Sequence, residues 1–349
     1  MASEMGKLTR RNLLKGGAGL TAGLLAAPYV ARAQAVDAIK FSLEFRNYGG
    51  NAPMFLGNEN GIYKSLGLDI TPEGSSGSGE SVNRVATGSH PFGTADASTA
   101  VEFASRNPAS APKIVMTVFD RFPAVVISFK RKPISTLQEM VGKKIGVGSA
   151  DAGSRILPAL LSRAKVDLAS INRVTVDVKL RDIMLMKGDV DGVVGFDYTT
   201  IFNLIEAGAK LEDINLLYFS DFGFDFPGNS LIVNPEVLQK NPDLVRRVAA
   251  ATARTWVAGN KDRPAAIAAV MKRDRLLKQD TELARMSWVY DKLILTPAVK
   301  QNGLGHIDTA RVTNGINVLK EGFNLAQAPT LAQIYDGRFL PPVADRKFA

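Results

Sequence analysis

Short apolar runs alternate with helical patterns along most of the chain, and this alternation constrains the fold more than any other feature. Runs with strand character, each bounded by turn residues, are AIKFSLEF, IVMTVF, AVVISF, KKIGVG and GVVGF. Between most of them, apolar residues recur at helical spacing. Strands and helices that alternate in this way predict an α/β protein with largely parallel sheets.

The first repeat of this pattern can be followed residue by residue. Residues 51–70, NAPMFLGNENGIYKSLGLDI, predict a turn, a helix, a second turn and a strand. Asn51 can cap the free amides, Pro53 suits a first helical turn, and Gly67 ends the helix. Residues 76–88, SGSGESVNRVATG, predict a flexible loop, a short helix and a glycine beyond its end.

Residues 1–35 carry the features of an export signal. Arg10 and Arg11 form a basic pair, a short apolar stretch follows, and ARAQA at 31–35 supplies small residues for cleavage near Ala33 or Ala35. The apolar stretch is short, glycine-rich and interrupted by Pro28, whereas a membrane-spanning helix needs about 20 apolar residues. The arginine pair resembles a twin-arginine signal, which acts as an address and not as an anchor.

Composition is consistent with a free periplasmic protein. The chain has no cysteine, which excludes disulfides, thiolate metal sites, cysteine nucleophiles and a lipid-modified cysteine tether. Residues 1–35 hold five basic residues and one acidic residue, so their removal lowers the formal charge from +9 to +5. The remaining basic residues alternate with apolar ones at helical spacing, which indicates solvated helix faces and argues against nucleic-acid binding.

The sequence lacks the residues required by two glycine-rich motifs of nucleotide-binding proteins. Gly146, Gly148 and Gly153 do not have the spacing of a dinucleotide fold. Residues 148–154 resemble the first part of a P-loop, but Arg155 follows and the Lys-Ser/Thr pair of a P-loop is missing. The stretch still places backbone amides at a helix N-terminus, which suits a polar or anionic ligand group. An ordinary strand-to-helix turn explains the same residues equally well.

Motifs for catalysis are weak. His90 and His306 have no second metal-type ligand at a recognised spacing, and GNSLIV lacks the second glycine of a nucleophile elbow. We therefore expect a protein that is not an enzyme and that needs no cofactor and no metal.

Residues 51–70 also resemble the opening of a family of exported solute-binding proteins, which includes the thiamine-pyrimidine, nitrate, taurine and sulfonate binders. GIYK at 61–64 and GLDI at 67–70 match the motifs at which that family ends its first helix and begins its second strand. Four later segments agree in order, so that the resemblance covers essentially all of residues 36–349: RVATGSHPFGTADAS, STLQEMVGKKIGVGSADAGSR, MKGDVDGVVGFDY and GNSLIVNPEVLQKNPDLVRR.

The resemblance implies a two-lobed periplasmic binding protein fold of type II. Each lobe would hold a mostly parallel sheet flanked by helices, and two crossing strands, AVVISF and NSLIVN, would form the hinge. These crossings predict a first lobe at 36–128 and 231–349 and a second lobe at 129–230. The family further implies a monomer that closes around a solute by hinge motion and delivers it to an inner-membrane permease with its ATPase.

Turns that follow the strands would line the cleft between the lobes. They supply the predicted ligand-binding residues Asn47, Tyr48, Asn51, Asp96, Ser98, Ser149, Asp151, Gly153, Ser154, Phe196, Asp197, Tyr198, Phe224 and Asn229. Aromatic faces beside a few polar groups suit a flat ring, although burial in the core is the competing explanation for each aromatic residue.

Asp197 occupies roughly the place where the thiamine-pyrimidine branch has an acidic residue that bonds an aminopyrimidine. The resemblance therefore favours a thiamine pyrimidine precursor or a similar nitrogen heterocycle, with a sulfonate, taurine, nitrate or an aromatic carboxylate as the alternative. A periplasmic sensor or an enzyme on the same scaffold is a further alternative. The enzyme of this family needs a cysteine-rich motif and a histidine, whereas this chain has no cysteine and has Asn51 where many members have histidine.

Overall fold

The structure is a computed structural model and describes residues 36–322, 325 and 327–348. The predicted twin-arginine signal at 1–35 lies outside the described residues. None of the described helices is long and apolar enough to cross a bilayer.

The first sheet has five strands in the order β2-β1-β3-β10-β4. Their bounds are β1 Asp37–Ser42, β2 Leu68–Glu73, β3 Phe92–Asp96, β4 Lys113–Thr117 and β10 Asn229–Val233. β1 runs parallel to β2 and β3, and β10 runs antiparallel to β3 and β4.

The second sheet repeats this arrangement with the order β7-β6-β8-β5-β9. Its strands are β5 Ala124–Phe129, β6 Lys144–Val147, β7 Asn172–Thr175, β8 Gly192–Phe196 and β9 Ile214–Tyr218. β6 runs parallel to β7 and β8, and β5 runs antiparallel to β8 and β9.

The α/β class and the two sheets confirm the sequence prediction, with one correction. Two of the four strand pairs in each sheet are antiparallel, so the sheets are mixed and not mostly parallel. The reason is that β5 and β10 each enter their sheet from the other lobe and run against the strands beside them.

The lobe boundaries also shift from their predicted positions. β5 was predicted to end the first lobe at residue 128, but it pairs with β8 and β9 in the second sheet. β10 begins at Asn229 and pairs in the first sheet, whereas the prediction kept residues up to 230 in the second lobe. The crossings are therefore the segments at 118–123 and 219–228, which connect strands of different sheets.

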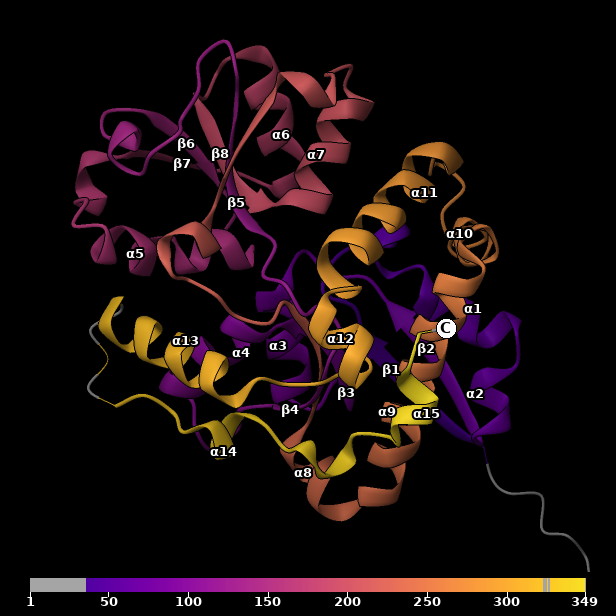
Figure 1. Cartoon of the computed structure of the whole chain (residues 1–349). Helices are drawn as coiled ribbons and strands as arrows, with labels where there is room; N and C mark the ends of the chain where they lie inside the picture. The colour runs from indigo at the N-terminus through magenta and orange to yellow at the C-terminus, as the bar shows by residue number, and fades with distance from the viewer. Residues whose placement is uncertain (1–35, 323–324, 326, 349) are drawn as a thin grey trace, which may run out of the picture. The chain divides into compact units, whose positions relative to one another are not determined.

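Helices connect and flank these strands. The helices up to residue 206 are α1 Pro53–Glu59, α2 Ile62–Ser65, α3 Ser78–Ala86, α4 Ala97–Arg106, α5 Ala152–Arg163, α6 Val178–Lys187 and α7 Asp197–Glu206. The last part of the chain is largely helical and contains α8 Pro235–Lys240, α9 Pro242–Lys261, α10 Arg263–Met271, α11 Gln279–Trp288, α12 Pro297–Asn302, α13 Thr309–Gly322, α14 Leu331–Ile334 and α15 Val343–Arg346. In this part, α13 packs on α5, and α11 packs on α7 (Figure 1).

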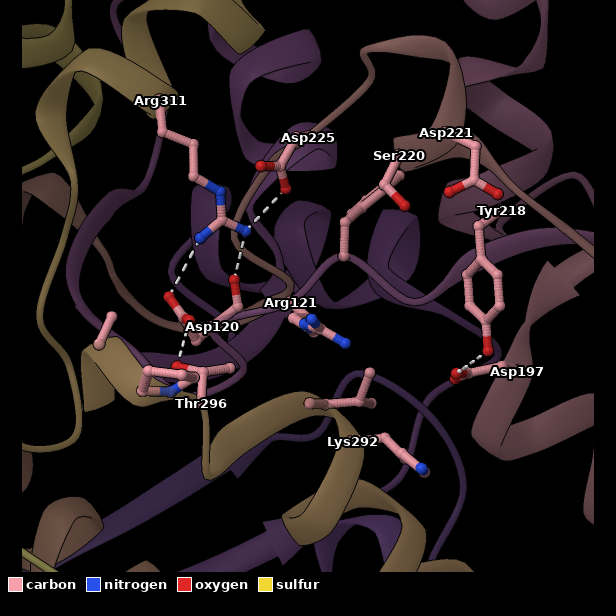
Figure 2. Close-up of a pocket in the computed structure, with 14 residues that line it drawn as sticks. Asp120, Arg121, Asp197, Tyr218, Ser220, Asp221, Asp225, Lys292, Thr296 and Arg311 are labelled. Carbon is pink, nitrogen blue, oxygen red and sulfur yellow. Dashed lines mark hydrogen bonds and ion pairs between the residues drawn. The ribbon is translucent and has the colours of Figure 1, made fainter. Parts of the chain in front are cut away.

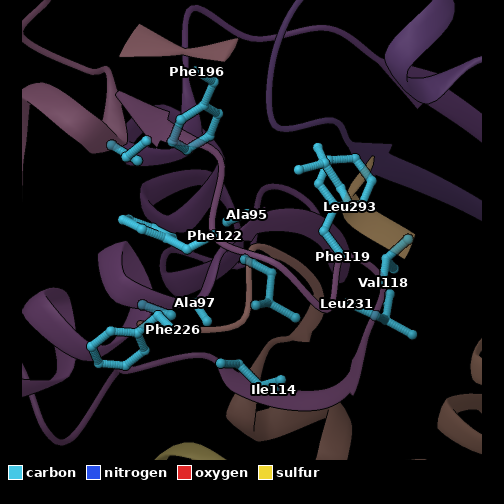
Figure 3. Packing of buried hydrophobic residues seen from close by; sticks show 14 of the residues in the cluster. Ala95, Ala97, Ile114, Val118, Phe119, Phe122, Phe196, Phe226, Leu231 and Leu293 are labelled. Carbon is cyan, nitrogen blue, oxygen red and sulfur yellow. The ribbon is translucent and has the colours of Figure 1, made fainter. Parts of the chain in front are cut away.

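Buried aromatic residues of the crossings join the two sheets. Phe119 and Phe122 of the first crossing lie in one hydrophobic cluster with Phe196 of β8 and Leu231 of β10 (Figure 3). The rings of Phe122 and Phe196 have their centres 6.3 Å apart. This shared core anchors the crossings between the sheets.

Candidate ligand-binding cleft

The segments that follow strands of both sheets meet around one small enclosed cavity. Residues after β1 and β2 form one side, and residues after β6, β7 and β8 form the other. The lining consists of Glu44, Phe45, Ser76, Gly77, Ser78, Asp151, Ala152, Val178, Phe196, Tyr198 and Thr199. The cavity measures about 20 Å³, which holds about one water molecule.

Glu44 organises the side that belongs to the first sheet. Its carboxylate is buried and accepts hydrogen bonds from Thr94 Oγ1 at 2.6 Å, from Tyr48 Oη at 3.2 Å and from Asn51 Nδ2 at 3.3 Å. Burial raises the pKa of Glu44, and these donors oppose the rise. These hydrogen bonds hold the Tyr48 side chain in place in the turn after β1.

Three aromatic rings continue from one sheet to the other. Tyr48 stacks on Tyr198 with ring centres 6.0 Å apart, and Tyr198 stacks on Phe196 at 5.8 Å. Asn229 Nδ2 donates to Tyr198 Oη at 3.1 Å. The three rings therefore stack on one another in this structure, and no space for a flat solute remains between them.

Two aspartates cap the helices that begin beside the cleft. Asp96 Oδ1 accepts from the amide of Ser98 at the start of α4, and Asp151 Oδ2 accepts from the amide of Ser154 in α5. The α5 amide predicted for an anionic ligand is thus already bonded to the chain's own carboxylate. A second anion at this helix end would meet repulsion from Asp151.

Asp96 is the more unusual of these two groups. Burial raises the pKa of the Asp96 carboxyl from 3.8 to about 7, hydrogen bonds from Ser98 oppose the rise, and the nearby Asp151 adds to it. Within the part of the chain that the structure describes, Asp96 Oδ2 and Asn229 Oδ1 are buried and accept no hydrogen bond. Both are oxygen acceptors, and the two residues face each other in the pairing of β3 with β10.

The arginines near the cleft are engaged elsewhere. Arg155 pairs with the buried Glu102 at 2.7 Å, and Arg181 contacts Asp151 at 3.5 Å and Asp182 at 2.9 Å. Arg46 donates to Asn203 at 3.1 Å, but its buried Nε has no hydrogen-bond partner among the described residues. Apart from this donor, the groups left for a ligand are mainly acceptors.

Several bonds hold the two sides of the cleft together. Gly79 N donates to Ala150 O at 3.2 Å, directly between the loops of the two lobes. Arg285 of α11 is fully buried and donates to the carbonyl oxygens of Tyr198 at 2.9 Å and Thr199 at 3.0 Å, while its Nε pairs with Glu282 at 3.0 Å. A solute larger than water can enter only when these contacts separate.

Comparison with known proteins agrees with this architecture. Residues 50–263 match the family described as NMT1/THI5 like. The chain belongs to this family. The prediction made from the sequence motifs is therefore confirmed at the level of the family.

Solved structures share the fold of this NMT1/THI5-like chain. The alkanesulfonate-binding protein SsuA from Xanthomonas axonopodis pv. citri, bound to MOPS, is 12% identical, with 87% of this chain and 99% of that chain covered and a TM-score of 0.64. The periplasmic aliphatic sulphonate-binding protein SsuA from Escherichia coli is 14% identical, with coverage of 85% and 91% and a TM-score of 0.62. The Candida albicans CA3427 gene product, which exhibits the periplasmic binding protein fold, is 14% identical, with coverage of 86% and 96% and a TM-score of 0.62. No curated protein matches the sequence, and these low identities establish the two-lobed fold alone.

Most of the predicted site residues of the NMT1/THI5-like chain lie at or beside the cleft. Asp151, Phe196 and Tyr198 line the enclosed cavity. The residues that surround it through the hydrogen bonds and ring contacts described above are Tyr48, Asn51, Asp96, Ser98, Ser154 and Asn229.

Four predicted residues do not line the cavity and form none of these contacts. Ser149 is exposed, and Gly153 lies where an added Cβ would contact Val194 at 3.3 Å. Phe224 is fully buried in the aromatic cluster of the crossings, 5.6 Å from the ring centre of Phe122. Asn47 is partly buried beside Gly74, and its Oδ1 accepts no hydrogen bond from the described residues.

Asp197 does not line the enclosed cavity, although it stands between two residues that do. Its Oδ2 accepts from Tyr218 Oη and from Trp288 Nε1, each at 3.0 Å, and its Oδ1 accepts from the amide of Tyr198. Burial raises the pKa of the Asp197 carboxyl to about 6, and the bonds from Trp288, Tyr198 and Tyr218 oppose the rise. The start of α7 turns this side chain to the opposite side of the crossings.

The side chain of Asp197 lines a second, larger cavity of about 640 Å³. Figure 2 shows its lining, which includes Asp120, Arg121, Tyr218, Lys292 and Arg311. Phe122 also lines this cavity, whereas Phe196, which it contacts, lines the enclosed one. The contact between these two rings therefore lies between residues of the two linings.

Eight lining residues are not among those predicted from the sequence: Glu44, Phe45, Ser76, Gly77, Ser78, Ala152, Val178 and Thr199. Glu44 and Phe45 were assigned to the first strand, but β1 ends at Ser42. Ser76 and Ser78 belong to the glycine-serine loop after β2, which follows a strand as the other predicted segments do. Applying the same rule to that loop identifies them.

Proposed function

We propose that this protein is the extracytoplasmic solute-binding component of an ATP-driven importer. The observation that carries the proposal is the enclosed cavity at which segments following the strands of both sheets converge, held shut by contacts across the cleft. A cavity of about 20 Å³ admits no organic solute, so binding requires that the lobes open and then close around it. Family membership supports this reading, since the NMT1/THI5-like family resembles exported binders of small solutes.

The solute is a flat molecule rich in hydrogen-bond donors, such as a thiamine pyrimidine precursor or a related nitrogen heterocycle. Glu44 and Asp151 line the cavity as acceptors, and Tyr198 and Phe196 offer aromatic faces. Tyr48 lies behind this lining, stacked on Tyr198. An aminoheterocycle stacks on such faces and donates to carboxylates from its edge. A sulfonate, nitrate or carboxylate needs cationic partners, and Arg155 and Arg181 are already paired with carboxylates. Of these arginines, only Arg46 forms no ion pair with the described residues.

Delivery of the solute follows from this role. The protein acts in the periplasm after export and passes the solute to a membrane permease, whose ATPase supplies the energy. The cleft performs no chemistry: its buried groups recognise the solute and release it unchanged. Asp197 lies outside the recognition surface in this proposal, and Glu44 and Asp151 take its place.

The deciding experiment is calorimetric titration of the protein starting at Val36. The probes are a 4-aminopyrimidine, taurine, nitrate and benzoate, with thermal unfolding in parallel. A ligand at 100 times its dissociation constant stabilises the folded state by about 2.7 kcal/mol. Saturable binding of the aminopyrimidine, lost in Glu44→Ala and kept in the exposed control Asp69→Ala, supports the proposal. If taurine, nitrate or benzoate binds and the aminopyrimidine does not, the proposed transport role stands and the proposed class of solute is wrong.

A further inference from the structure

We propose that the large cavity beside the crossings is a second ligand site, separate from the solute cleft, which binds a small organic carboxylate. Its volume of about 640 Å³ lies in the range of small-molecule sites. Its walls come from both crossings, from the start of α7 and from the segment at 292–298. This site does not depend on the proposed transport function.

The acidic groups of this cavity are mostly satisfied by the protein itself. Arg311 pairs with Asp120 at 3.0 Å and with Asp225 at 2.9 Å. Both oxygens of Asp197 accept hydrogen bonds, as described above. Figure 2 shows these two clusters on opposite sides of the cavity. Asp221, which is exposed, is the fourth lining carboxylate.

Two cationic side chains of the lining remain available. Among the described residues, neither Arg121 nor Lys292 forms a side-chain hydrogen bond or an ion pair. Lys292 Nζ lies 5.9 Å from the ring centre of Trp288, and in Figure 2 the guanidinium of Arg121 lies between the Arg311 cluster and the Tyr218–Asp197 pair. The unused hydrogen-bonding capacity of the lining is therefore mainly that of donors.

A guanidinium and an ammonium facing one polar cavity favour an anion with several acceptor oxygens. Arginine binds a carboxylate through two parallel hydrogen bonds, and lysine adds a mobile charge. The apolar part of such a ligand would lie against Phe122, Leu293 and Pro297 of the same wall. The chemistry of this site is thus opposite to that of the acceptor-rich cleft.

Trp288 provides a direct probe of this cavity. The chain has two tryptophans, so Trp256→Phe leaves Trp288 as the only one, with its indole bonded to Asp197 and beside Lys292. Succinate is titrated into this variant at constant ionic strength, and Trp288 emission is followed together with the heat of binding in the otherwise unchanged protein. The same titration is made with Arg121→Gln/Lys292→Gln and with Lys40→Gln/Arg173→Gln, which removes two exposed charges outside both cavities.

We expect succinate to bind saturably. Its affinity should fall at least tenfold in Arg121→Gln/Lys292→Gln and stay unchanged in the control pair. Lack of saturation in the unchanged protein overturns the site. Equal weakening in both pairs of variants also overturns it, because it indicates a general charge effect. Since Arg121 and Lys292 are exposed, folding of the variant is expected, and circular dichroism checks it. If succinate does not bind, the proposal of solute binding in the cleft is unaffected. If the cleft binds no solute, the succinate titration still tests the second site.

Discussion

Tyr48 and Tyr198 stack across the cleft, with their ring centres 6.0 Å apart and their planes inclined by 25°. Tyr48 follows β1 of the first sheet, and Tyr198 follows β8 of the second. In the proposed function, a flat solute would lie between these two rings. Solute binding and this ring contact are therefore expected to exclude each other.

Replacement of Tyr198 tests its role as a stacking surface. Tyr198→Leu removes the aromatic face. We expect affinity for the solute found by calorimetry to fall by about two- to tenfold, since an aromatic contact contributes about 0.5–1.5 kcal/mol beyond its buried area. Tyr198→Phe keeps the ring and loses only the hydroxyl bonded to Asn229, so its affinity should remain within a few-fold. Equal affinity in both variants would exclude stacking on this ring.

The ion pair between Glu102 of α4 and Arg155 of α5 joins the two lobes at 2.7 Å. Arg155→Gln removes it and should shift the unliganded protein toward an open state. Because the chain has no cysteine, spin labels can be placed at two exposed positions, Thr87→Cys and Lys187→Cys, without removing native thiols. Electron paramagnetic resonance distances should lengthen in the Arg155 variant.

Arg106 supplies the matched control for that experiment. It pairs with the same carboxylate at 3.3 Å, but both residues lie in α4. Arg106→Gln should therefore leave the distance between the labels unchanged. A similar lengthening in both variants would show that Glu102 acts within its own lobe.

Asp96 should make stability depend on pH. Its pKa is raised from 3.8 to about 7 in the folded state, so the folded protein keeps a proton that the unfolded chain releases. Stability from this group is therefore complete below its ordinary pKa and is lost as the pH rises to about 7, by up to about 4 kcal/mol. Urea unfolding from pH 4 to 8 should show this loss reduced in Asp96→Asn. The exposed control Asp69→Asn should follow the parent protein, and parallel profiles for all three would refute the assignment.

Asp197→Ala is expected to affect stability more than solute binding. It removes the acceptor of Tyr218 and Trp288, and a buried group left without its partner costs about 1–3 kcal/mol. Chemical denaturation measures this loss, and Asp221→Ala, an exposed carboxylate of the same cavity, should be nearly neutral. A tenfold loss of cleft affinity with unchanged stability would instead restore the sequence-based assignment of Asp197 to the solute site.

Arg285 and Glu282 form a buried pair whose disruption should be costly. Arg285→Met leaves the Glu282 carboxylate buried without its cation, and we expect a loss of about 3–5 kcal/mol in urea unfolding at pH 7. The double variant Glu282→Gln/Arg285→Met removes the uncompensated charge and should recover part of it. No recovery would indicate that the bonds from Arg285 to the Tyr198 and Thr199 carbonyls carry the effect.

Local periodicity in the sequence determined the α/β class and the order of most strands and helices, and sequence motifs indicated the family. These properties depend on residues near one another in the chain, such as Gly67 and Gly88, which adopt left-handed backbone conformations where the predicted helices end. The motifs of 51–70 carry the family resemblance in the same local way.

Only the tertiary structure decided which side chains meet. Phe196, Asp197 and Tyr198 are consecutive, yet the first and third line the enclosed cavity and the second lines the large one. Spacing cannot reveal this division, because it depends on how α7 leaves β8 and on the bonds that Tyr218 and Trp288 donate from distant segments. The pairing of β5 and β10 with the opposite sheet is decided in the same way, by contacts between strands far apart in the chain.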